Sequence, residues 1–131
     1  MNAVKPSDAK REATSLLRAT MQQEELAWPD VPEPVAMRCS DGGEGVRFQY
    51  LVHVEHAQDA KVLAARFKQY WQGRGLEVKS SEEDLGSKYG TVYSATARAA
   101  SGPSAAIEVS RVGVNLYVDS PCAEGDIADY E

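Results

Sequence analysis

At 131 residues the chain has the length of one domain with a core of its own. Its net charge of −6 opposes binding to a phosphate backbone, which argues against nucleic acid as a partner. No apolar run approaches the roughly 18 residues of a membrane-spanning helix, and residues 1–13 contain no apolar segment of a signal peptide.

The first half of the chain predicts a helix, a connector and two strands. Residues 7–23 carry apolar side chains at helical spacing, and the proline-rich stretch "WPDVPEP" (28–34) predicts an extended connector anchored by Trp28. The short apolar run "PVAMRC" predicts a first strand. Residues 46–55 alternate strictly, which predicts a longer strand with one buried face made of Val46, Phe48, Tyr50, Val52 and Val54.

The second half predicts a second helix followed by four strands. Residues 57–72 have helical periodicity, and "LEVKS", "TVYSATARAA", "AAIEVSR" and "VNLYVDS" indicate strands. The polar stretch "SSEEDLGSKYG" (80–90) is expected to be a loop or the widened tip of a hairpin. The last residues, 123–131, are acidic and small, and we expect them to fray.

This order of elements predicts a single α+β domain. Two helices should pack on one face of a mostly antiparallel sheet of about six strands, because only one side of the main strand is continuously apolar. The sheet and the second helix should occupy residues 35–122. The side chains expected to make the contact are Leu16, Leu17 and Met21 of the first helix and Leu63, Phe67 and Trp71 of the second.

The motif "HVEH" (53–56) is the one stretch that suggests a metal site. Zinc needs three or four converging ligands, but on a strand His53 and Glu55 point to one side and His56 to the other. The chain has no third histidine. The acidic stretch 80–90 also lacks the alternating acids and central glycine of a calcium loop. We therefore expect no bound metal.

Catalytic motifs are equally lacking in the sequence. There is no G-x-S-x-G elbow, and the glycine clusters "GGEG" and "GRG" are too short and wrongly placed to cradle a phosphate. The aromatic stripe of the second helix has the spacing of core residues rather than of a cofactor site. The sequence predicts no catalytic residue and no cofactor, and hence a protein that is not an enzyme.

Two cysteines carry the most informative signal. Cys39 ends the first predicted strand, and Cys122 follows the last after a Ser-Pro break, with no C-x-x-C spacing for redox or metal chemistry. This placement at strand ends favours a disulfide between Cys39 and Cys122. The remaining choice is between a cytosolic protein and an exported domain without its signal, and the disulfide favours export.

An amphipathic first helix, a cysteine before the main strand, a helix running into "YWQGRGLEV" and a closing "DSPC" form a familiar combination. Over residues 7–122 the chain resembles the small cell-envelope lipoproteins of actinobacteria, including the LppA-like group. The resemblance implies an extracytoplasmic domain held at the membrane by a lipidated N-terminal cysteine, which is not among the residues of this chain. It implies no enzymatic activity.

These features predict a non-enzymatic extracytoplasmic binding or interaction domain, with a protein or another cell-envelope component as partner. Its candidate surface is the exposed face of the main strand, made of Arg47, Gln49, Leu51 and His53. Contact with the membrane should be peripheral and only through the lipid anchor. The alternative is an immunity or inhibitor protein that neutralises a basic toxin or hydrolase by charge complementarity.

Overall fold

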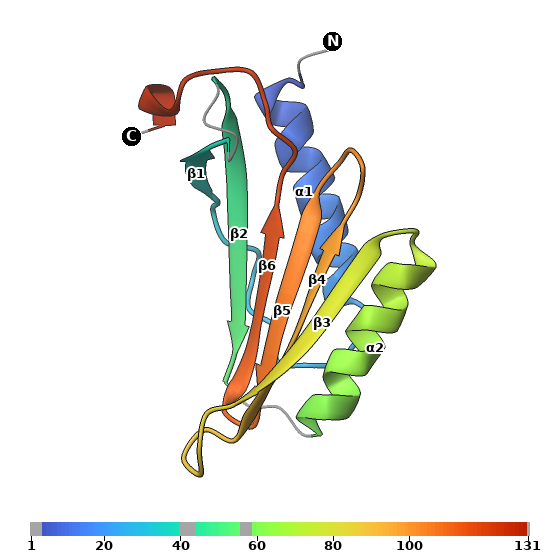
Figure 1. Ribbon diagram of the computed structural model, residues 1–131. Coiled ribbons are helices and arrows are strands. Elements are labelled where there is room, and N and C mark those ends of the chain that lie inside the picture. The colour runs from blue at the N-terminus through green and yellow to red at the C-terminus, as the bar shows by residue number, and fades with distance from the viewer. Residues whose placement is uncertain (1–3, 40–43, 56–58, 131) are drawn as a thin grey trace.

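A computed structural model describes residues 4–39, 44–55 and 59–130 of the chain (Figure 1). Its six strands form one sheet in the order β1-β2-β6-β5-β4-β3, and every pair of neighbours is antiparallel. The prediction of an α+β fold with two helices on a six-stranded antiparallel sheet is confirmed. The elements are α1 (Pro6–Met21), β1 (Val35–Arg38), β2 (Val46–Val54), α2 (Ala60–Gly73), β3 (Glu77–Asp84), β4 (Thr91–Arg98), β5 (Ser104–Ser110), β6 (Gly113–Asp119) and a short 3-10 helix, η1 (Ile127–Tyr130).

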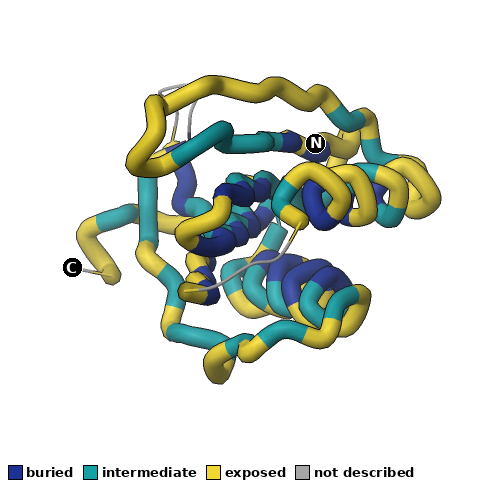
Figure 2. The backbone as a smooth tube through the Cα atoms, turned by 90° about the horizontal axis from the view of Figure 1, so that it is seen from below, coloured by how far each residue is buried: buried dark blue, intermediate teal, exposed yellow. Residues whose placement is uncertain are grey.

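Both helices cover the same face of the sheet. α1 packs on β2, β6 and β5, and α2 packs on β4, β5 and β3, as the strand pattern predicts. Seen from below, the buried residues lie between the helices and the strands (Figure 2). The burial of β2 alternates along its length, so its apolar face is covered and its other face is not. The buried face of the sheet is continued by Ile107 and Val109 of β5 and by Val114, Leu116 and Val118 of β6.

A buried hydrogen bond connects the two helices inside the core. The indole Nε1 of Trp71 on α2 donates to Oγ1 of Thr20 on α1 over 3.1 Å, and both side chains are fully buried. Thr20 is a polar residue at an apolar position, and it is tolerated there because its hydroxyl is satisfied. The connector is anchored as predicted, since the ring of Trp28 meets Phe67 edge to face at 6.4 Å.

The polar stretch from residue 80 onward differs from its prediction. β3 continues through it to Asp84 and pairs with β4 residue by residue, as far as Asp84 opposite Thr91. Only residues 85–90 form the turn, closed by a hydrogen bond from Leu85 N to Gly90 O of 2.9 Å. Because β3 is an edge strand exposed over most of its length, it needs no apolar alternation, and its charges protect the edge from pairing with other chains.

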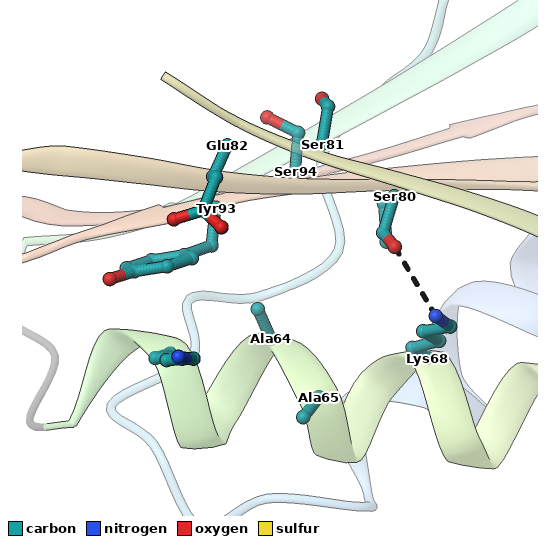
Figure 3. A pocket seen from close by; sticks show the side chains of 10 residues that line it. Ala64, Ala65, Lys68, Ser80, Ser81, Glu82, Tyr93 and Ser94 are labelled. Carbon is teal, nitrogen blue, oxygen red and sulfur yellow. Dashed lines mark hydrogen bonds between the residues drawn. The ribbon is translucent and has the colours of Figure 1, made fainter. Parts of the chain in front are cut away.

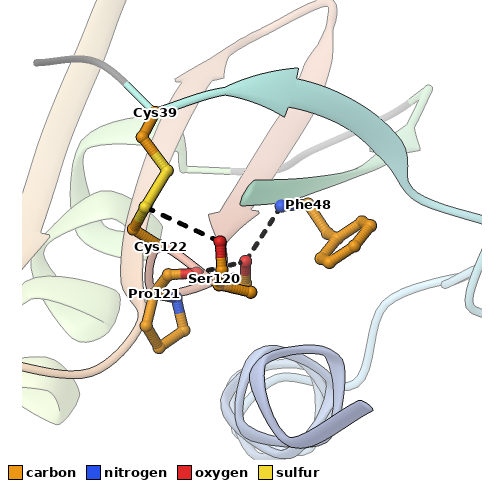
Figure 4. The surroundings of a disulfide bond; sticks show 6 residues. Cys39, Phe48, Ser120, Pro121 and Cys122 are labelled. Carbon is orange, nitrogen blue, oxygen red and sulfur yellow. Dashed lines mark hydrogen bonds between the residues drawn. A yellow bond between two sulfur atoms is a disulfide. The ribbon is translucent and has the colours of Figure 1, made fainter. Parts of the chain in front are cut away.

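The disulfide between Cys39 and Cys122 is present, with an S–S distance of 2.01 Å and a Cα–Cα distance of 5.8 Å. It connects the ends of β1 and β6, which flank β2 on opposite sides, so the bridge crosses the start of β2 (Figure 4). Gly45 lies beneath the crossing with φ of +124°, and a Cβ there would approach the Cys122 sulfur to 2.7 Å. Only glycine leaves room for the bridge at this point.

The segment after Cys122 folds back on the domain, whereas the sequence indicated a frayed tail. Ala123 is buried, and its N–H and C=O both bond to Val46, at 2.7 and 3.0 Å. The ring of Tyr130 in η1 meets Phe48 edge to face at 5.2 Å, and the ammonium of Lys10 lies over both rings. The disulfide brings this segment to β2, where these contacts become available.

Candidate functional site

The side of the sheet away from the helices, here called the open face, carries the residues singled out in the sequence. The burial pattern of β2 places Arg47, Gln49, Leu51 and His53 together on this face. Three of the four are held by neighbours on β6, and the fourth, Leu51, is 47% exposed. The predicted set is therefore a contiguous strip.

Asp119 of β6 contacts Arg47 and Gln49, the two residues of this strip that come first in β2. Its Oδ1 accepts a hydrogen bond from Gln49 Nε2 at 2.9 Å, and its Oδ2 lies 3.3 Å from Arg47 Nη1. Farther along β2, Nδ1 of His53 lies 2.7 Å from Oδ1 of Asn115 on β6. Each contact joins two strands that are hydrogen-bonded neighbours, so the polar groups of the open face are fixed in position by the sheet itself.

The β6 residues of the open face were missed by sequence reasoning. Asn115, Tyr117 and Asp119 alternate with the buried Val114, Leu116 and Val118, so the signal for their orientation was present in "VNLYVDS". What the sequence lacks is the register, which places Tyr117 opposite Leu51 and Asp119 opposite Gln49. Tyr117 also donates from its hydroxyl to Glu108 Oε1 on β5 at 2.9 Å.

The open face contains a hollow at each end. The one beside the disulfide, here the disulfide-end hollow, has a volume of about 390 Å³. It is open because three small side chains, Thr96, Ser104 and Ala106, form its floor. Its charged residues are Arg47, Arg98 and Asp119.

The second hollow, here the turn-end hollow, measures about 190 Å³ and lies near His53, where the β3–β4 and β5–β6 turns meet. Its rim carries three exposed large apolar side chains, Leu85, Tyr89 and Val112. The guanidinium of Arg111 donates to the backbone carbonyls of Ser87 and Lys88, which holds the two turns together. The rim is thereby fixed against the open face.

A third cleft, of about 290 Å³, lies between α2 and the strands β3 and β4 (Figure 3). It exists because Ala64 and Ala65 of the helix meet polar side chains of β3 instead of apolar ones. Lys68 Nζ donates to Ser80 Oγ across it at 3.3 Å, and Glu82 and Tyr93 project from the strands toward the helix. The cleft is a polar gap at the edge of the core.

The structure describes the two cysteines and part of the candidate metal motif at residues 53–56. His53 and Glu55 lie in β2 and just after it, while His56 is outside the described residues. Within the described ranges, no three His, Cys, Asp or Glu side chains are placed to hold a metal ion. Both cysteines are disulfide-bonded, so neither offers a thiolate as nucleophile or ligand.

Comparisons with known proteins identify no relative of this chain. No family model, no curated protein and no solved structure matches this chain. Among the described residues, no helix is both long and apolar enough to cross a membrane. The disulfide is consistent with a location outside the cytoplasm.

Two tyrosines, Tyr117 on the open face and Tyr50 on the covered face of β2, predict a response to alkaline pH. Burial, and next the hydrogen bond to Glu108 and its charge, raise the pKa of Tyr117 above its ordinary value of 10.0. Burial and the charge of Glu33 raise the pKa of Tyr50 in the same direction. Both pKa values are higher in the folded state than in the unfolded state. The two tyrosines therefore contribute fully to the free energy of unfolding below about pH 10, and this contribution is lost as the pH rises through the folded-state pKa values.

We therefore expect the free energy of unfolding to fall above pH 10, and to fall less steeply in Tyr117→Phe. Urea denaturation at a series of alkaline pH values, with phenolate absorbance followed in parallel, measures both effects. Tyr89→Phe, at an exposed tyrosine of the same face, is the control and should behave as the parent protein. Identical alkaline slopes for Tyr117→Phe and the parent would contradict the assignment.

Proposed function

We propose that this chain is a non-enzymatic binding domain that works outside the cytoplasm and docks a protein partner through the open face. The observation that carries the proposal is the distribution of exposed large apolar side chains. Of the seven in the described residues, five lie on this face or at its rim, and they are Val35, Leu51, Leu85, Tyr89 and Val112. Apolar groups gathered around fixed polar ones are typical of protein-binding surfaces.

The compartment supports the same function. The disulfide suits an oxidising environment, and we propose that the domain is a lipoprotein, held at the outer side of the cell membrane by a lipid anchor as in the actinobacterial proteins it resembles. A domain so tethered meets its partner at the cell envelope. The open face would then be the recognition surface, and the helices would support it from behind.

The docking proposal predicts that Leu51 contributes strongly to partner binding. Leu51→Glu should lower the amount of partner retained from a cell-envelope extract by about tenfold, because it places a charge at the centre of the apolar contact. Val62→Glu is the matched control, since Val62 is 49% exposed against 47% for Leu51 but lies on α2. Quantitative mass spectrometry of the retained proteins gives the readout.

The proposal requires one protein whose retention depends on Leu51 and not on Val62. Retention that is equal for both variants, or that is lost only in Val62→Glu, would contradict docking through the open face. Thermal unfolding of both variants shows whether either has changed the fold.

The inhibitor alternative is favoured by a different observation. The edge strand β3 exposes Glu77, Glu82, Glu83 and Asp84 in a chain that already carries a net charge of −6. A basic toxin or hydrolase would bind there by charge, and the complex would dissociate at high salt. Neutralising Glu82, Glu83 and Asp84 would weaken such a complex, whereas Leu51→Glu would spare it.

A further inference from the structure

The disulfide-end hollow contains more positive charge than its place in an acidic protein would suggest. The chain has 20 acidic and 14 basic residues, yet the hollow has two arginines, Arg47 and Arg98, and one acid, Asp119. The three charged groups that line the hollow sum to +1, and Glu77 and Lys79, which face Arg98 and Thr96 from β3, offset each other. An anionic group would be repelled by most of the molecule and attracted here.

The guanidinium groups also have donors to spare. Asp119 is shared, because it accepts from Gln49 at 2.9 Å and meets Arg47 at the longer distance of 3.3 Å. Nε of Arg47 is buried without a hydrogen-bond partner among the described residues. Arg98 is exposed and forms no ion pair with any residue that the structure describes. A ligand acceptor in the hollow would therefore meet the exposed guanidinium of Arg98 and the Nη groups of Arg47, whereas the buried Nε of Arg47 is out of its reach.

The shape of the hollow fits more than a small ion. Thr96, Ala106 and Tyr117 lie side by side on β4, β5 and β6, so an aromatic wall borders a floor of small side chains. A volume of about 390 Å³ accommodates an anionic group together with the chain to which it is attached. The turn at Gly102 and the disulfide close the ends of the hollow.

We propose that the disulfide-end hollow binds the carboxylate of a peptide, with Arg98 and Arg47 as its charged donors. The planar guanidinium fork matches a carboxylate, and one negative charge balances the net charge of the hollow. A phosphate dianion would carry more negative charge than the hollow balances and would be repelled by Asp119. The inference rests on the proposed function, because it names the chemical group that the open face recognises in its partner.

The test uses defined peptides instead of the natural partner. ¹⁵N-labelled protein is titrated with N-acetyl-dialanine bearing a free C-terminal carboxylate, and the amide resonances of Thr96 and Ala106 and the Nε resonance of Arg98 are followed. We expect saturable shifts of these three signals. The C-terminal amide of the same peptide should bind at least about tenfold more weakly, because it lacks the charge that the arginines recognise.

The variant Arg98→Gln should lower the affinity for the free acid by about tenfold, while Arg18→Gln, at an exposed arginine of α1, should leave it unchanged. N-acetylglutamate diamide distinguishes a side-chain carboxylate from a chain terminus as the source, and inorganic phosphate tests the other anion. Binding of either carboxylate through Arg98 supports the proposal. Equal binding of acid and amide, indifference to Arg98→Gln, or tighter binding of phosphate would overturn it.

This test is independent of partner docking. Val62→Glu, on α2 and away from the hollow, should bind the free-acid peptide like the parent protein. If the peptide fails to bind while partner retention still depends on Leu51, the carboxylate inference is wrong and the docking proposal stands.

Discussion

Replacing both cysteines, in Cys39→Ser/Cys122→Ser, is expected to lower the free energy of unfolding by about 4 to 5 kcal/mol. The bridge spans 83 residues of sequence, so in the chain-entropy model its removal restores much freedom to the unfolded chain. The melting temperature should fall by about 10 to 20 °C. Differential scanning calorimetry of the variant and the parent measures both quantities.

The same variant should keep its sheet at room temperature. β1 pairs with β2 over four residues, and β6 is bonded to both β2 and β5, so the strands do not depend on the bridge for their pairing. The segment from Ala123 to Tyr130 should loosen first, because the bridge lies directly before it. Far-ultraviolet circular dichroism like that of the parent, with faster hydrogen exchange at Ala123, is the expected pattern. A melting temperature unchanged within about 2 °C would contradict a structural role.

Truncating the buried tryptophan, in Trp71→Ala, is expected to cost about 3 to 5 kcal/mol. Trp71 is fully buried, packs against Phe67 at a ring-centroid distance of 6.2 Å and is hydrogen-bonded to Thr20 on the other helix. Its removal would leave a cavity and would also remove the hydrogen bond between α1 and α2. Chemical denaturation in guanidinium chloride gives the loss directly.

Two further variants serve as comparisons for Trp71→Ala. One removes only the hydrogen bond, and the other is a control on the surface of α2. Thr20→Val keeps the volume but leaves the indole N–H without its acceptor, which should cost about 1 to 3 kcal/mol. Val62→Ala, on the exposed side of α2, should change the stability by less than about 0.5 kcal/mol. A loss below about 1 kcal/mol for Trp71→Ala would show that the helices are not held through this residue.

The part of the fold that could be predicted from sequence is the part in which burial alternates or repeats. β2 was predictable because five apolar residues at a spacing of two must share a face, and α2 because Leu63, Phe67 and Trp71 follow a helical period. The disulfide was predictable because both cysteines stand at strand ends. In each case a local pattern reported on tertiary burial.

The rest depends on neighbours that lie far apart in the sequence. Residues 81–84 of β3 give no pattern because all of them are exposed, and their strand character comes from pairing with β4. The partners of the predicted strip, Asp119 and Asn115, follow from the register between β2 and β6. The disulfide-end hollow arises where small side chains of β4 and β5 are adjacent. None of these features has a local signature.

The open face is the proposed surface where this domain meets its partner. A photoreactive amino acid placed at position 51, and in a second protein at position 62, tests it in cells that produce the domain natively. Irradiation should give a discrete crosslinked protein from position 51 and none from position 62, because only the first lies on the open face. A crosslinked partner from position 62 with none from position 51 would contradict the account.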